Sequence, residues 1–270
     1  MADKGRKNNP KIVAIANQKG GVGKTTTTIN LAAGLGEMGK RVLIIDLDPQ
    51  GNSSTGLGVQ SDKRKFTTYE LLLEDIELKK VIMETDIKNL AIVPATIDLS
   101  SADIELYSNE KRVFMLQKSL GQPSMRDFCF DFILIDCPPS LNLLTINAMV
   151  AANSVLIPLQ SEFFALEGLS QLMLTIREVR ATANKNLRIE GVVLTMFDSR
   201  NNLSVLVEED ARENLGDLVF SSKIPRNVRV SEAPSHSLPV LSYDPTSKGA
   251  QAYRDLASEF LKNNQSPRAD

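Results

Sequence analysis

The feature that most constrains this chain is a glycine-rich loop between an apolar run at residues 12–16 and a helical pattern at residues 25–38. The loop reads Asn-Gln-Lys-Gly-Gly-Val-Gly-Lys-Thr-Thr over residues 17–26. Glycines let backbone N–H groups converge on phosphate oxygens, and the N-terminus of the following helix adds the positive end of its dipole. A plain strand-to-helix turn does not need Gly-Lys-Thr at the start of the helix, so the pattern indicates a phosphate-binding loop.

Short apolar runs recur along the chain and are typical of buried parallel strands, because they are rich in β-branched residues and leucine without polar alternation. They lie at residues 12–16, 42–45, 90–93, 132–135, 155–158 and 192–195. Helical patterns between and after them lie at residues 25–38, 142–151, 166–181, 205–215 and 247–262. Strands that alternate with helices predict an α/β fold, a doubly wound, mostly parallel sheet flanked by helices.

We predict a single domain at residues 11–262, with a disordered basic tail before it at 1–10 and a polar tail after it at 263–270. We find neither a secretory signal nor a run near the roughly 20 apolar residues that a membrane span needs. The formal net charge of −2 argues against a uniformly basic nucleic-acid-binding protein and leaves a local basic patch open. Cys129 and Cys137 fit no metal motif, so we expect reduced core thiols in a cytoplasmic protein.

Within the loop, Lys24 would place its cation on the β- and γ-phosphates, and the hydroxyl of Thr25 would ligate Mg²⁺. One departure from the standard pattern stands out. Gln18 occupies the position of the first glycine, and a second lysine, Lys19, follows it. The residues expected to bind nucleotide here are Gly20, Gly21, Val22, Gly23, Lys24, Thr25 and Thr26.

Two predicted strands end in acidic residues, Asp46 and Asp48 after the first and Asp136 after the second. In an open α/β sheet, ligands bind beyond the carboxyl ends of the strands, so these acids face the same crevice as the phosphate loop. We predict that Asp136 holds the Mg²⁺ shell, that Asp48 positions the attacking water, and that Asp46 helps through water. Mg²⁺ and two lysines should lower the pKa of such carboxylates. Each acid could instead be a helix cap or turn residue.

Lys-Gly-Gly-x-Gly-Lys-Thr-Thr at 19–26 resembles the deviant Walker A motif of the ParA/MinD family of P-loop ATPases. Asp-Leu-Asp-Pro-Gln-Gly-Asn at 46–52 and Ile-Asp-Cys-Pro-Pro-Ser at 135–140 resemble motifs of ParA-type partition ATPases. Residues 224–236, Ile-Pro-Arg-Asn-Val-Arg-Val-Ser-Glu-Ala-Pro-Ser-His, are similar to a segment of chromosomal ParA proteins, often called Soj. The resemblance covers nearly the whole chain from about residue 11 to residue 262.

The resemblance implies a slow, partner-stimulated ATP hydrolase with ATP and Mg²⁺ as cofactors. Lys19 would be the signature lysine, which reaches across an ATP-dependent homodimer and cancels transition-state charge. Together with Lys24 on the phosphates and Asp48 on the attacking water, Lys19 would form the catalytic set. The resemblance also places Pro225 and Asn227 at the adenine. We expect the lone histidine, His236, to be structural and hydrogen-bonded rather than catalytic.

The resemblance further implies that the ATP-bound dimer binds double-stranded DNA without sequence preference. Arg200 and Arg229 match positions at which chromosomal ParA proteins carry DNA-binding arginines. The remaining candidates are Lys223, Arg226, Lys248 and Arg254. All of them could instead be ordinary solvated charges, and Arg226 could serve the nucleotide loop.

The implied partner is a ParB-like centromere-binding protein that stimulates hydrolysis and release, as part of nucleoid-associated chromosome or plasmid partition.

Two other functions stay open. A MinD-like or orphan ParA-like positioning ATPase would bind lipid or a protein scaffold instead of DNA. We expect no membrane partner, because Tyr253, Leu256 and Phe260 of the last predicted helix form a core-packing face. A regulatory module with negligible hydrolysis would control replication initiation through its monomer–dimer state, and this role could coexist with partition.

Overall fold

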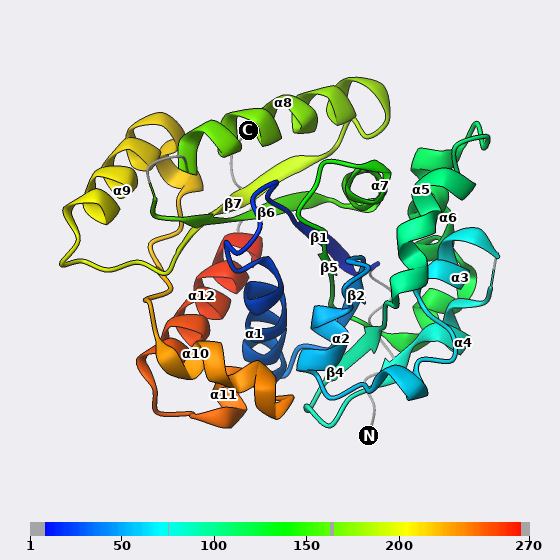
Figure 1. The fold of residues 1–270 in the computed structure, drawn as a ribbon, viewed down its shortest axis with the longest axis horizontal. Coiled ribbons are helices and arrows are strands. Elements are labelled where there is room, and N and C mark those ends of the chain that lie inside the picture. Colours follow the sequence, from blue (N-terminus) through cyan, green and yellow to red (C-terminus); the bar gives the residue numbers. More distant parts are fainter. Residues whose placement is uncertain (1–8, 75, 163–164, 266–270) are drawn as a thin grey trace.

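The computed structural model describes residues 9–74, 76–162 and 165–265, and its strands form a seven-stranded sheet between two layers of helices (Figure 1). The strands are β1 (Lys11–Ile15), β2 (Val42–Asp46), β3 (Met83–Glu84), β4 (Leu90–Val93), β5 (Phe132–Asp136), β6 (Ser154–Gln160) and β7 (Arg188–Thr195). Their spatial order is β3-β4-β2-β5-β1-β6-β7, and each pairing is parallel except that of β3 with β4. The predicted doubly wound α/β fold is confirmed.

The helices connect these strands and cover both faces of the sheet (Figure 1). They are α1 (Lys24–Glu37), α2 (Asn52–Gly56), α3 (Thr68–Leu73), α4 (Leu78–Val81), α5 (Ala102–Glu105), α6 (Met115–Leu120), α7 (Leu143–Ala151), α8 (Ala165–Thr182), α9 (Asn202–Leu215), α10 (Val228–Glu232), α11 (Val240–Tyr243) and α12 (Lys248–Gln265). Short 3-10 turns lie at Ser61–Lys63, Ile97–Ser101, Arg112–Phe114, Pro123–Phe128, Gly216–Leu218 and Ala233–His236.

Alternate residues of each strand enter different cores, as expected for a sheet with helices on both faces. In β2, Val42 and Ile44 pack in the core beneath α1 and α12, whereas Leu43 and Ile45 pack in the core shared with α7 and α8. Helices α1 and α12 approach closely at Gly34, where an added Cβ would lie only 2.9 Å from the Cβ of Ala257. The core-packing face predicted for the last helix is therefore present.

The structure extends several of the predicted elements and adds others. β7 begins at Arg188, and α12 continues to Gln265 through the first residues of the predicted polar tail. Asn264 holds this last turn by donating to the carbonyl of Phe260 and to Oε1 of Glu190, both at 2.7 Å. Residues 1–8 and 266–270 of the two predicted tails lie outside the described residues.

One expectation about the cysteines is wrong. Cys137 is buried behind β5, but Cys129 is exposed. The difference is local, because Cys129 has a left-handed backbone (φ 51°) in the turn before β5 and so stands outside the strand. Among the helices of the described residues, none is long and apolar enough to cross a membrane.

Candidate nucleotide-binding site

The glycine-rich loop leaves β1 at the carboxyl edge of the sheet and enters α1. Gly21 (φ 74°) and Gly23 (φ 85°) adopt left-handed conformations, which side chains disfavour and glycine accepts freely. Gly23 is the N-cap residue of α1 and has no side chain with which to cap it. The first backbone N–H groups of α1 are therefore placed to bind an anion such as a phosphate.

Hydrogen bonds to two neighbouring strands, β6 and β7, fix the shape of the loop. Asn17 donates from Nδ2 to the carbonyl of Pro158 at 2.8 Å, and its Oδ1 accepts from the backbone N–H of Lys19 at 3.0 Å. On the other side, the hydroxyl of Thr195, at the end of β7, donates to the carbonyl of Val22 at 2.8 Å. The loop is thus preorganised by contacts that lie far away in sequence.

The two lysines of the loop have different surroundings. Lys24 is 6% exposed, and its Nζ donates to the carbonyl of Lys19 at 2.8 Å across the mouth of the loop. Burial lowers the pKa of Lys24, and the negative charge of Asp136 opposes this shift. The side chain of Lys19 packs on Gly168 of α8, where a Cβ would lie 3.5 Å from its Cε. Lys24 therefore faces the acids of the site, while Lys19 lies against α8.

The predicted acids meet at the edge of the sheet, beside Lys24. Asp46 and Asp136 are register partners at the ends of β2 and β5, and both are 0% exposed. Asp48 is 7% exposed and accepts the backbone N–H of Gln50 at 2.9 Å. The structure therefore brings together the carboxylates that sequence reasoning assigned to metal and water.

Two serines that sequence reasoning missed bind these carboxylates. Ser53 donates from Oγ to Oδ2 of Asp136 at 2.7 Å, and Ser54 donates from Oγ to Oδ2 of Asp46 at 2.6 Å. Both serines are 0% exposed, in the first turn of α2. The sequence places both serines directly after the acidic motif, which indicates that they lie near the site. It does not show which carboxylate each hydroxyl would reach.

Burial dominates the pKa values of the two acids at the strand ends. Burial raises the pKa of Asp46, and repulsion from Asp136 adds to this rise. Burial likewise raises the pKa of Asp136, against hydrogen bonds from Ser53 and Thr25 and the attraction of Lys24. For Asp136, the loss of hydration outweighs the attraction of Lys24.

The donor set of the site suits Mg²⁺. Mg²⁺ prefers oxygen ligands and is usually bound by one or two protein groups together with phosphate oxygens and water. The hydroxyl of Thr25 and the carboxylate of Asp136 are such groups, and their hydrogen bond contributes to the pKa of Asp136. In the described part of the chain, no three His, Cys, Asp or Glu side chains form a metal-binding group, so a self-sufficient protein cage is not present there.

A pocket of about 210 Å³ adjoins the phosphate loop. It is lined by Gly23, Thr26, Thr195, Met196, Ile224, Pro225, Arg226, Asn227, Val230, Ser231, Pro234 and Tyr253. The segment predicted to hold the base therefore lies beside the start of α1, brought there by backbone pairing of Phe197 with Pro225. Asn227 uses Oδ1 to cap α10, accepting from the N–H groups of Arg229 and Val230, which leaves its Nδ2 as the donor for a base.

Known proteins with this arrangement are numerous. A family model described as "AAA domain" matches residues 10–189. The chain is 50% identical over 253 residues to the sporulation initiation inhibitor protein Soj of Bacillus subtilis, with 94% of this chain and 99% of Soj covered. It is 51% identical over 262 residues to the chromosome partitioning protein ParA of Caulobacter vibrioides, with 97% and 98% covered. The chain belongs to the ParA/MinD family of P-loop ATPases.

Solved structures of similar proteins agree with this family. The fold matches a cobyrinic acid a,c-diamide synthase from Mycobacterium smegmatis with bound ATP analogue and magnesium, at a TM-score of 0.84 and 38% identity over 96% of this chain and 97% of that one. It also matches the cell division ATPase MinD of Pyrococcus furiosus, at a TM-score of 0.77 and 30% identity over 93% and 98%. ATP and Mg²⁺, the cofactors predicted from the sequence, are confirmed for the family.

Arg200 and Arg229, two of the arginines predicted to bind DNA, are paired with acids. Arg200 is 87% exposed and chelates Asp198 through Nε at 3.0 Å and Nη2 at 2.9 Å. Arg229 contacts Glu232 at 2.9 Å and Asp244 at 3.3 Å. Exposed pairs of this kind are weak, so both guanidinium groups can exchange a carboxylate for a phosphate at little cost.

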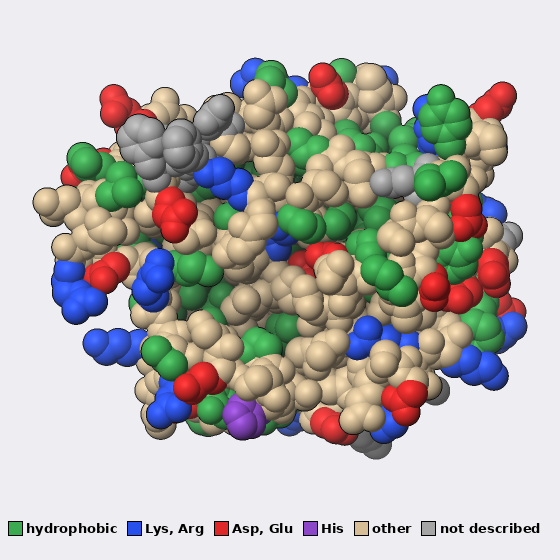
Figure 2. Space-filling model, in the orientation of Figure 1, with side chains coloured by type: hydrophobic (Ala, Val, Ile, Leu, Met, Phe, Trp, Pro, Cys, Tyr) green, Lys and Arg blue, Asp and Glu red, His purple; other side chains and the backbone are tan. Residues whose placement is uncertain are grey.

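The other predicted cations fall into two groups. Lys223 lies 2.7 Å from Glu208 and 4.4 Å from the ring centroid of Phe197, and Arg254 joins α12 to Glu37 of α1 at 2.7 Å. These contacts give both residues a structural task. Arg226 and Lys248 are exposed. Figure 2 shows Lys and Arg side chains at the left edge of the molecule, around α9 and α10, interspersed with acids.

His236 is exposed and stacks on Tyr243, with ring centroids 4.7 Å apart and an interplanar angle of 22°. This places the histidine against α11, in a structural contact of a different kind from the hydrogen bond that was expected.

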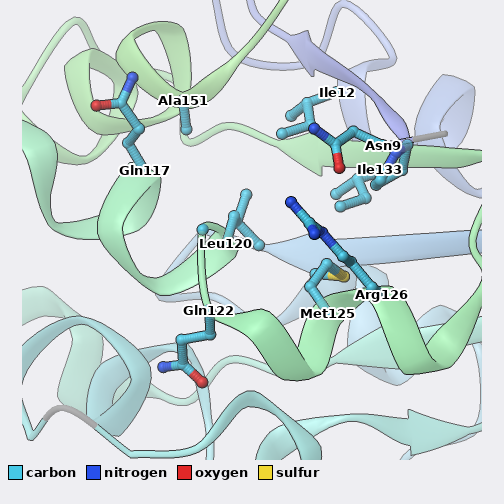
Figure 3. A pocket seen from close by; sticks show the side chains of 11 residues that line it. Asn9, Ile12, Gln117, Leu120, Gln122, Met125, Arg126, Ile133 and Ala151 are labelled. Atoms are coloured by element: carbon cyan, nitrogen blue, oxygen red, sulfur yellow. The ribbon is translucent and has the colours of Figure 1, made fainter. Parts of the chain in front are cut away.

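A second pocket, of about 240 Å³, lies at the opposite edge of the sheet, where β1 and β5 begin. Arg126 extends between Met125 and Ile133 toward Asn9 (Figure 3). The acids and the glycine loop described above do not line it, so we assign the nucleotide to the carboxyl edge.

Proposed function

We propose that this chain is a partition ATPase, whose ATP-bound homodimer binds DNA without sequence preference and releases it when a ParB-like partner stimulates hydrolysis. The observation that carries the proposal is the near-full-length identity of about one half to Soj and to ParA. Dimer-dependent hydrolysis needs a cation that reaches the partner's phosphates and a carboxylate that orients water, and Lys19 and Asp48 would supply them. DNA binding in turn would associate the protein with the nucleoid.

The proposed chemistry follows from the positions of five side chains. When bound, Mg²⁺ neutralises charge on the β- and γ-phosphate oxygens. Lys24, beside the acids, would hold the same oxygens, and Thr25 and Asp136 would hold the metal. Asp48 accepts a hydrogen bond from the attacking water and places it in line with the γ-phosphate. Lys19 reaches the phosphates of the partner subunit, so that dimerisation and transition-state stabilisation are one event.

DNA binding would then depend on the dimer. Residues 198–201 expose Arg200, and residues 221–231 expose Arg226 and Arg229, so each subunit offers only a few phosphate contacts. Each phosphate neutralised contributes a slope of about −0.9 to the dependence of log K on log salt for duplex DNA. Two subunits joined by ATP double that number, so the affinity of the dimer exceeds that of the monomer most clearly at moderate salt.

The test is a titration of unrelated duplex DNA with ATP or ADP, across a salt series. We expect salt-steep binding with ATP only, lost in Arg229→Glu while ATP-driven dimerisation survives. Arg126→Glu is the matched control, because it reverses one exposed arginine at the opposite edge of the sheet. A wild-type chain that dimerises with ATP and leaves DNA unbound would refute the DNA-binding function and favour a cargo- or membrane-positioning relative. ATP hydrolysis with DNA and a ParB-like protein separates partition from a purely regulatory module.

A further inference from the structure

Two buried serines lie in the first turn of helix α2, which directly follows the segment that carries Asp48. Ser53 and Ser54 donate to Asp136 and Asp46, at 2.7 and 2.6 Å. Hydroxyl-to-carboxylate hydrogen bonds of this length are among the strong ones in proteins. The first turn of α2 is therefore fastened to the ends of β5 and β2, whose acids form the floor of the site.

Ser54 makes more than one of these contacts. Its backbone N–H donates to Oδ2 of Asp46 at 2.9 Å, and its Oγ also accepts from the N–H of Ala95, after β4, at 3.1 Å. Strands β4, β2 and β5 are neighbours in the sheet. The two serines consequently join the start of α2 to three adjacent strands.

The short segment between β2 and α2 is held at both ends. At the β2 end, the N–H of Leu47 donates to the carbonyl of Asp136 at 3.0 Å, and that of Asp48 donates to Oδ1 of Asp46 at 3.3 Å. At the α2 end, Gly51 has φ 62°, and a Cβ there would lie 2.9 Å from the carbonyl oxygen of Ala95. Asp48 thus lies in a short segment between the strand ends on one side and the start of α2 on the other.

We propose that Ser53 and Ser54 are positioning residues for ATP hydrolysis, because they hold α2 on Asp136 and Asp46 and thereby fix Asp48 relative to Lys24. This rests on the proposed function, in which Asp48 orients the attacking water. The serines are buried and contact the two carboxylates and the backbone of Ala95, and none of these contacts is with the pocket or the phosphate loop. Their loss therefore affects the rate of the chemical step more than the affinity for ATP.

The kinetic test compares Ser53→Ala and Ser54→Ala with Ser119→Ala. Ser119 is a matched control, since it is 4% exposed and donates at 2.8 Å to a backbone carbonyl, that of Leu71, away from the site. A misplacement of about 1 Å can cost about 100-fold in rate, so we expect kcat to fall about 10- to 100-fold in both site variants. KM for ATP should stay within about threefold of the wild-type value, and the Ser119 variant should match the wild type.

Hydrogen exchange of the nucleotide-free protein provides a readout that does not depend on hydrolysis. We expect residues 47–56 to exchange about tenfold faster or more in Ser54→Ala, and to be unchanged in Ser119→Ala. Unchanged exchange in residues 47–56, a kcat equal to that of the wild type, or a raised KM with unchanged kcat would each overturn the positioning role. A wild-type chain that does not hydrolyse ATP would instead refute the proposed function, while the exchange result still decides whether the serines hold the segment.

Discussion

The link between Thr195 and the phosphate loop offers a sharp test of how the site is preorganised. Thr195 ends β7, is 2% exposed, and donates to the carbonyl of Val22 at 2.8 Å. Thr195→Val keeps the shape of the side chain and removes only the hydroxyl. The variant therefore leaves one buried carbonyl oxygen without its donor and changes no residue of the loop itself.

The size of the effect follows from the burial of the acceptor. Val22 is 2% exposed, so water cannot easily replace the lost donor. An unpaired buried acceptor costs about 1–3 kcal/mol. In a chain of this size, 1 kcal/mol lowers Tm by about 2–4 °C, so a loss of about 2 kcal/mol should lower Tm by about 4–8 °C. Because the loop then samples other shapes, we expect affinity for Mg·ATP to weaken by up to about tenfold, the equivalent of 1.4 kcal/mol.

The assay is thermal unfolding without nucleotide, together with calorimetric titration of Mg·ATP. Thr182→Val is the control, because Thr182 is exposed and its hydroxyl donates to the carbonyl of Glu178 on the surface of α8. Surface changes of this kind stay within about 0.5 kcal/mol. A Thr195→Val protein with unchanged Tm and unchanged ATP affinity would refute the idea that β7 preorganises the loop.

Two further predictions concern buried or site carboxylates. Asp48→Ala should bind ATP and dimerise but lose at least about 100-fold in phosphate release, since the water is no longer oriented; a variant that stays monomeric with ATP in sedimentation would contradict this role. Glu190→Gln should lower the free energy of unfolding by about 2–3 kcal/mol. The carboxylate of Glu190 is 6% exposed and accepts hydrogen bonds from Lys11, Ser154 and Asn264. Because Lys11 is partly exposed, the loss should be smaller than that for a fully buried ion pair. Denaturant unfolding against Glu178→Gln measures it, and a difference below about 0.5 kcal/mol would show that the cluster is not stabilising.

Contiguous motifs made much of the site predictable from sequence. The phosphate loop, the acids after β2 and β5 and the apolar strands each lie within a few residues, and local pattern alone identifies them. The carboxyl ends of parallel strands share one edge, so strand order was not needed to expect Asp46 and Asp136 together. Their register pairing in β2 and β5 agrees with that expectation.

Other elements left no readable local pattern. The short helices α3 to α6 span only four to six residues each, too few for a helical periodicity to stand out. Strand β3 has two residues and was not predicted. The ion pair of Arg254 with Glu37 joins residues far apart in the sequence, because α12 packs beside α1. Cys129 was expected in the core, but a left-handed turn exposes it.

The sequence by itself determined the fold class, the phosphate loop and the identity of the acids, because each depends on residue types at short spacing. Only the tertiary structure decided what surrounds them. Thr195 reaches Val22, Ser53 reaches Asp136, and residues 225–227 reach the start of α1 from far along the chain. Burial of both strand-end carboxylates, which raises their pKa values, also follows from packing. Hydration and long-range contacts depend on which segments lie together in space, and local sequence does not specify that.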